Sequence, residues 1–143
     1  MATSRAEPGR SRTWYALGIA VTIAVGLASR ANAAQLPWWL AKTAGDALYA
    51  TMMFWIVGWL APRASTGRVA LVAIAVCFAI ELAQWIHTPW LDAVRATLPG
   101  RLVLGQGFHA RDLACYVVGA GLAAAIERAA RARVLPDHPG ISG

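Results

Sequence analysis

The chain has 143 residues, of which 58% are apolar and only 14% are charged. A soluble domain carries roughly 25% charged residues, so this chain has too few charged side chains to cover a soluble surface. The net charge is +6, but the arginines lie at the edges of apolar blocks and form no basic stripe interleaved with aromatic residues. This arrangement excludes a nucleic-acid-binding protein and predicts the lipid bilayer as the main partner.

Four apolar blocks, separated by short polar stretches, predict an all-α fold: an integral membrane bundle of four short transmembrane helices. In chain order the expected helices cover residues 13–29, 45–60, 69–86 and 112–126. A span needs about 17 to 25 apolar residues, so Asp46 and Asp112 should lie near the edge of the hydrocarbon layer. The expected domains are a disordered cytoplasmic tail (1–12), the four-helix membrane domain (13–128) and a flexible basic tail (129–143).

The first block has a competing interpretation. Basic residues, an apolar stretch and Ala31-Asn32-Ala33 resemble a secretory signal peptide with its cleavage site. Arg30 argues against cleavage because it places a charge just before that site, and three further apolar blocks follow. After the first block, Trp38 and Trp39 predict an interfacial turn, because tryptophan prefers the headgroup layer.

The basic residues predict the orientation. With four spans, one side of the membrane receives Arg5, Arg10, Arg12, Arg63, Arg68, Arg128, Arg131 and Arg133. The other side receives Arg30, Lys42, Arg95, Arg101 and Arg111. The positive-inside rule then predicts that both termini are cytoplasmic.

A set of polar residues falls toward the outer face of this topology. A charge at mid-bilayer costs about 2.5 to 3.5 kcal/mol on insertion scales, so Glu81 should be neutral, paired with Arg30 or Arg95, or directed into a wet cavity. The alternative is that these groups only lock the helices together. We interpret them as a pocket, whose candidate residues are Arg30, Asp46, Tyr49, Glu81, Gln84, Trp85, Asp92, Arg95, His109, Asp112 and Tyr116.

No cofactor is expected from the sequence. The histidines and acids lack a recognisable metal-ligand spacing, and Cys77 and Cys115 lie inside apolar blocks as expected for small core residues. One regularity is present: Arg30, Asp46 and Tyr49 are echoed at similar spacing by a second set, Arg95, Asp112 and Tyr116. A duplicated hairpin would bring the two sets together.

The chain resembles the small bacterial membrane proteins of domain-of-unknown-function family 2809, which are related to the VanZ-like proteins. The resemblance covers residues 14–128, and its carriers are Gly26 to Arg30, Pro37, Gly45 to Tyr49, Glu81 to Gln84, Trp90 to Asp92 with Arg95, Leu104-Gly105 with Phe108, and Asp112 with Tyr116 and Gly119. Tyr116 stands where VanZ-like proteins usually have asparagine, and the early motif lacks their lysine and histidine. The VanZ role in tolerating a lipoglycopeptide antibiotic is therefore not carried over.

The resemblance implies a multi-pass protein of the bacterial inner membrane, with unsettled activity. We expect a non-enzymatic envelope protein whose outer pocket binds an anionic lipid headgroup, glycan or amphiphile, gripped by Arg30 and Arg95. An intramembrane acid/base enzyme acting on a lipid-linked substrate through Glu81 or Asp112 is an alternative, as is a proton-linked carrier. The sequence leaves a homo-oligomer open.

Overall fold

The protein is described by a computed structural model over residues 11–104 and 109–134, and this part of the chain is all-helical. Its elements are α1 (Arg12–Ala31), the 3-10 turn η1 (Ala33–Gln35), α2 (Trp38–Leu60), α3 (Thr66–Ala83), α4 (Pro89–Ala96), α5 (Leu98–Leu104) and α6 (Ala110–Val134). The predicted tail segments 1–10 and 135–143 lie outside the described residues, as do the family carriers Gly105 and Phe108.

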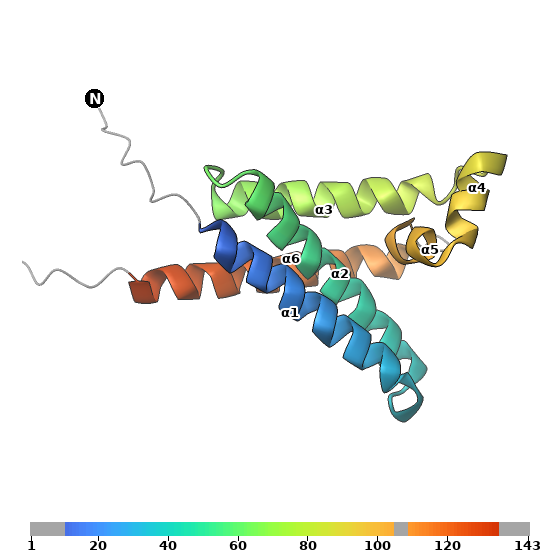
Figure 1. The fold of residues 1–143 in the computed structure, drawn as a ribbon, viewed down its shortest axis with the longest axis horizontal. Coiled ribbons are helices and arrows are strands. Elements are labelled where there is room, and N and C mark those ends of the chain that lie inside the picture. Colours follow the sequence, from blue (N-terminus) through green and yellow to red (C-terminus); the bar gives the residue numbers. More distant parts are fainter. Residues whose placement is uncertain (1–10, 105–108, 135–143) are drawn as a thin grey trace, which may run out of the picture.

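Four long helices form one bundle with two distinct ends (Figure 1). The start of α1 and the end of α6 lie at the same end, together with the turn between α2 and α3. The opposite end carries η1, the start of α2, the short helices α4 and α5, and the start of α6. The chain therefore runs in the same direction in α2 and α6, and α2 packs against α1, α3 and α6.

The prediction of four membrane spans is corrected to three candidate spans among the four long helices, all of which run between the two ends of the bundle (Figure 1). Three described helices, α1, α3 and α6, are long and apolar enough to cross a membrane. Helix α2 has 23 residues, but Lys42, Asp46 and its tryptophans lower its average hydropathy. The helices also extend past the predicted blocks, because α2 already begins at Trp38 and α6 continues through residues 129–134. Trp38 and Trp39 thus form the first turn of α2 rather than an interfacial turn before it.

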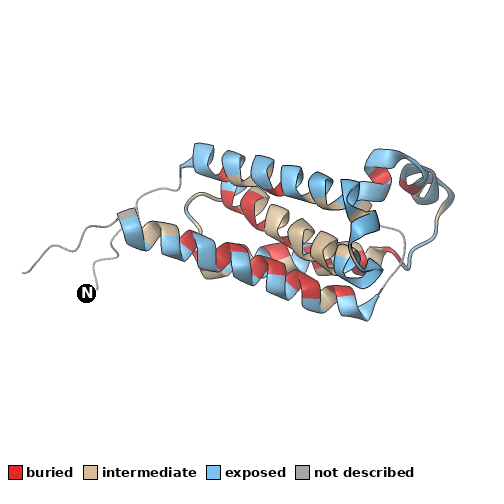
Figure 2. Ribbon diagram, turned by 90° about the horizontal axis from the view of Figure 1, so that it is seen from below, coloured by how far each residue is buried: buried red, intermediate tan, exposed pale blue. Residues whose placement is uncertain are grey.

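The outer surface of the bundle is apolar. On the long helices the buried residues form inward-facing stripes and the outer faces are exposed (Figure 2), and each short helix, α4 and α5, also has one buried residue. On α1 alone, Leu17 and Leu27 are 56% and 60% exposed. Exposed tryptophans lie near both ends of the helices: Trp14, Trp59, Trp38, Trp39, Trp85 and Trp90. Apolar helix faces between two levels of tryptophan are typical of membrane proteins, and the structure is compatible with one.

Small residues bring α2 and α6 into close contact. A Cβ atom added at Gly119 would lie 2.0 Å from the backbone oxygen of Ala47. The Thr51 hydroxyl donates to the backbone oxygen of Gly119 at 3.0 Å. Because the two backbones touch here, polar side chains from the first turns of both helices, including Asp46 and Asp112, are held side by side at the end opposite the chain termini.

Candidate functional site

Glu81 lies in the last turn of α3, and the residue is only 1% exposed. Its Oε2 accepts hydrogen bonds from Gln84 Nε2 and from the Tyr116 hydroxyl, both at 2.9 Å. Its Oε1 accepts from the backbone N–H of His109 at 2.9 Å. A buried carboxylate is costly unless it is hydrogen-bonded, and these three donors from α3 and from the start of α6 meet that requirement.

A second group of charges lines an open pocket of about 560 Å³. The pocket is formed by the first turns of α2 and by residues 109–112. Lys42 Nζ lies 3.4 Å from Asp112 Oδ1, and the Asp112 side chain is only 9% exposed. The carboxyl groups of Asp46 and Asp112 interact with each other, and Asp46 Oδ2 is buried without a hydrogen-bond partner among the described residues.

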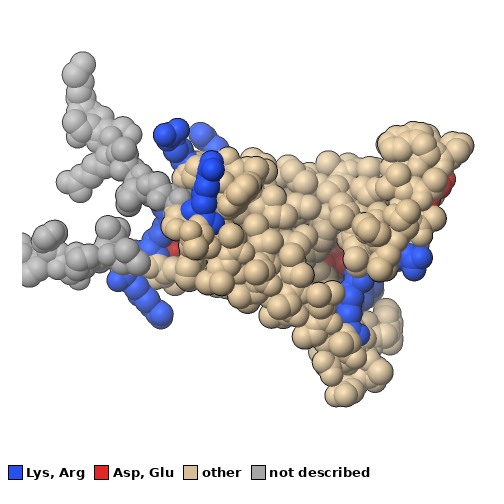
Figure 3. All heavy atoms as spheres, viewed as in Figure 1, with Lys and Arg blue, Asp and Glu red and all other residues tan. Residues whose placement is uncertain are grey.

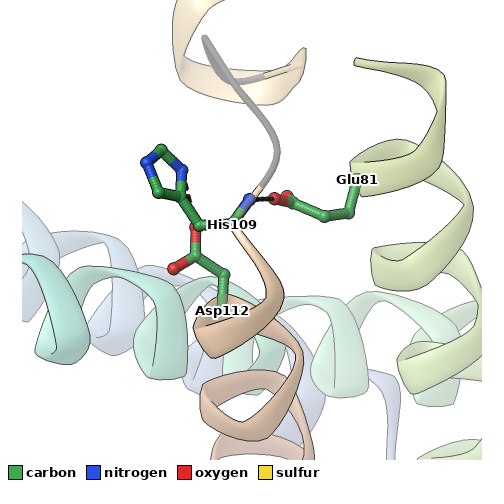
Figure 4. A group of neighbouring side chains, drawn as sticks. All are labelled: Glu81, His109 and Asp112. Atoms are coloured by element: carbon green, nitrogen blue, oxygen red, sulfur yellow. Dashed lines mark hydrogen bonds and ion pairs between the residues drawn. The ribbon is translucent and has the colours of Figure 1, made fainter. Parts of the chain in front are cut away.

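His109 joins the two groups. Its backbone N–H binds Glu81, while its ring Nδ1 lies 3.9 Å from Asp112 Oδ2, as Figure 4 shows. The pocket opens in the recess between the start of α2 and helices α4 and α5, where basic side chains and a carboxylate gather on the surface (Figure 3). The arrangement offers oxygen and nitrogen ligands, positive charge and aromatic surface within one small region.

Several predicted site residues are brought together here: Asp46, Tyr49, Glu81, Gln84, His109, Asp112 and Tyr116. The repeat interpretation expected the two sets of arginine and aspartate to meet. Asp46 lies beside Asp112, and the rings of Tyr49 and Tyr116 are 6.3 Å apart. The two arginines of the repeat do not join them.

Arg95 has a different environment from the one expected. It is 8% exposed, and its guanidinium donates to the backbone oxygens of Ala83 and Ile86 at 2.7 and 2.8 Å. It also donates to Asp92 Oδ1 at 3.2 Å. Arg95 thus caps the carbonyl groups at the end of α3, and in the described part of the chain it forms no ion pair with Glu81.

Of the predicted site residues, only Asp46, His109 and Asp112 line the pocket itself. Arg30 is exposed on the last turn of α1, and Trp85 is 63% exposed at the end of α3. Neither is among the residues that line the pocket. Tyr49 donates from its hydroxyl to the backbone oxygen of Val103 at 2.9 Å, which attaches α5 to α2.

Sequence reasoning missed the basic and aromatic lining of the pocket. Trp38 and Lys42 line it together with the predicted Asp46. The spacing of four residues from Trp38 to Lys42 and from Lys42 to Asp46 places all three on one helix face, and this spacing is the signal that could have identified the first two. Arg111 was also missed. The carboxylate of Glu127 at the opposite end was missed as well; it is 2% exposed and accepts a hydrogen bond from the Tyr15 hydroxyl.

Two comparisons bear on these residues. The model of one family, described as protein of unknown function (DUF2809), matches residues 35–120. The matched range contains both the Glu81 group and the pocket, whereas Tyr15 and Glu127 lie outside it. No solved structure matches the chain.

Proposed function

This chain belongs to the DUF2809 family of proteins of unknown function, and from that premise we propose that it is a multi-pass membrane protein that binds an anionic amphiphile. The binding site is the pocket at the start of α2 and α6. The observation that carries the proposal is the lining of that pocket, in which Lys42 and Arg111 lie with two exposed indole rings, those of Trp38 and Trp39.

The chemistry of the pocket fits an amphiphile at headgroup level. Exposed indoles sit at the boundary between headgroups and hydrocarbon, and an acyl chain can pack along them while a phosphate or carboxylate contacts Lys42 and Arg111. Both α2 and α6 begin at this end, so the partial positive charges of two helix N-termini also favour an anion there. Lys42 and Arg111 thereby take the role that the sequence assigned to Arg30 and Arg95.

The proposal includes a topology. The chain lies in a bacterial cytoplasmic membrane with the arginine-rich end, where α1 begins and α6 ends, in the cytoplasm. The described basic residues at that end are Arg12, Arg63, Arg68, Arg128, Arg131 and Arg133. The positive-inside rule supports this orientation, which directs the pocket to the outer face.

Native mass spectrometry of the protein purified in a mild detergent tests the proposal. The wild type should carry a lipid or glycolipid of defined mass, and the double variant Lys42→Ala with Arg111→Ala should lose it. Arg101→Ala is the matched control, because Arg101 is exposed at the same end and does not line the pocket. Equal occupancy in all three proteins, or a bare wild type, would reject the pocket.

A second measurement addresses the sign of the ligand charge. Added phosphatidylglycerol should raise the unfolding temperature of the wild type more than phosphatidylcholine does, and this difference should disappear in the double variant. An equal response to both lipids would show that the pocket does not select anionic headgroups.

Acid/base catalysis on a lipid-linked substrate has one observation in its favour. The carboxyl groups of Asp46 and Asp112 interact within the same pocket, and two neighbouring carboxyl groups in different surroundings can divide the roles of acid and base. If the protein is an enzyme, Asp46→Asn should retain the bound amphiphile but abolish its turnover. Release of the amphiphile by the same variant would assign Asp46 to binding alone.

A further inference from the structure

Three potential metal ligands converge beside the pocket. One carboxylate oxygen each from Glu81 and Asp112 and a ring nitrogen of His109 all lie within 4.8 Å of one another. Glu81 reaches from α3 toward the start of α6, where His109 and Asp112 are found (Figure 4). The spacing of these three residues in the sequence matches no known metal-binding motif. Only the packing of α3 against α6 brings Glu81 to the other two.

The separations suit a single ion. Nitrogen and oxygen ligands lie about 2.0 to 2.2 Å from a zinc ion, so two ligands of the same tetrahedral ion are about 3.3 to 3.6 Å apart. Atoms within 4.8 Å therefore need only small side-chain rotations to share an ion. Three protein ligands that leave a further position open are also the arrangement of zinc sites that bind an exogenous molecule.

The surrounding groups hold the ligands in place. Gln84 and Tyr116 donate to Oε2 of Glu81, and such outer contacts orient metal-binding carboxylates. Lys42 lies against Oδ1 of Asp112, while Oδ2 faces the His109 ring. One imidazole among carboxylates favours a transition metal over calcium or magnesium.

The charge balance also points to a cation. Asp46 adds a third carboxyl group beside Asp112, and its buried Oδ2 has no hydrogen-bond partner in the described part of the chain. Lys42 is the cation paired with Asp112 there. A divalent ion bound at Asp112 would offset the repulsion between these neighbouring carboxylates.

We infer that Glu81, His109 and Asp112 bind one divalent transition-metal ion, with Zn²⁺ as the first probe. This inference goes beyond the proposed amphiphile site and does not depend on it, because the metal is tested by itself in the absence of added lipid. If the amphiphile fails to bind and the metal binds, only the proposed function is rejected, and the reverse result rejects only the metal site.

The test is Zn²⁺ titration of the full chain in detergent, after removal of the purification tag and stripping with a chelator. Calorimetry and elemental analysis should find one tightly bound equivalent in the wild type. Affinity should fall at least tenfold in Asp112→Asn and in His109→Ala. His109 is exposed, so the second variant keeps the fold, which its unfolding temperature verifies.

Two matched controls complete the experiment. His87→Ala removes another exposed histidine at the same end, and Glu127→Gln removes a buried carboxylate that also accepts a tyrosine hydroxyl, at the opposite end. Both should bind Zn²⁺ as tightly as the wild type. A wild type that binds no equivalent, or binding that survives in both Asp112→Asn and His109→Ala, would overturn the inference.

Discussion

The hydroxyl of Tyr116 donates a hydrogen bond to Oε2 of Glu81 at 2.9 Å, across 35 residues of sequence. The bond joins α6 to the last turn of α3 and supplies one of the donors that a buried carboxylate requires. The same pairing recurs at the other end of the bundle, where Tyr15 donates to Glu127 and Arg131 lies 3.2 Å from the same carboxylate. Each end of the bundle is therefore held by a buried glutamate and a tyrosine from a different helix.

Tyr116→Phe removes that donor and leaves Glu81 with Gln84 and the His109 N–H. Hydrogen bonds to charged groups contribute about 1.5 to 3 kcal/mol, so the free energy of unfolding should fall by about that amount. Tyr49→Phe is the matched control, because Tyr49 donates to a neutral backbone oxygen and its loss should cost about 0.5 to 1.5 kcal/mol. Denaturant unfolding in micelles measures both, and a larger loss in Tyr49→Phe would contradict the importance of the Glu81 contact.

Gly119→Ala tests the close contact of α2 with α6. The new methyl group would lie 2.0 Å from a backbone oxygen that cannot rotate away, so the helices must separate. The free energy of unfolding should fall by about 1 to 3 kcal/mol. Gly121→Ala is the control, because a methyl group added there meets nothing within 4 Å. Its free energy of unfolding should equal or slightly exceed that of the wild type, since alanine favours helix. Equal stability of the two variants would argue against the helix crossing.

Arg95→Ala should loosen the end of α3. The guanidinium holds the backbone oxygens of Ala83 and Ile86, and the amide of Ile86 donates to that same Ala83 oxygen. We expect the Ile86 amide to exchange about tenfold faster, which corresponds to about 1.4 kcal/mol. Hydrogen exchange measured by mass spectrometry reports this rate. The control variant is Arg101→Ala, because Arg101 is exposed and its removal should leave exchange in the Ile86 segment unchanged.

Paired cysteine labelling tests the orientation. Ala96→Cys on α4 and Ala132→Cys near the end of α6 introduce exposed thiols at opposite ends, whereas the native Cys77 and Cys115 are buried. An impermeant thiol reagent should label Ala96→Cys in intact cells and Ala132→Cys only after lysis. The inverse pattern would place the pocket on the cytoplasmic side.

Much of the helical organisation was predictable from the sequence, but its details were not. The first, third and fourth apolar blocks correspond to α1, α3 and α6, because long apolar runs satisfy their backbone only as helices in lipid. The second block, 45–60, also forms a helix as part of α2, and its one charged residue, Asp46, interacts there with Asp112. The aspartate and the tryptophans of α2 lower its average hydropathy, so α2 is not among the three candidate spans of the described chain. Hydropathy does not register the partners that stabilise a polar residue in the bundle.

The sequence alone determined the residue types available for a polar site and the end of the bundle at which they gather, because hydrophobic blocks dictate where polar positions can lie. Tertiary structure alone decided their partners. It assigned Arg95 to the end of α3, Lys42 to Asp112, and the His109 backbone to Glu81. The contact of Lys42 with Asp112 depends on the close approach of α6 to α2 at Gly119. The other two depend on how α4 and the start of α6 pack against the end of α3, and a linear sequence pattern carries no information on such packing.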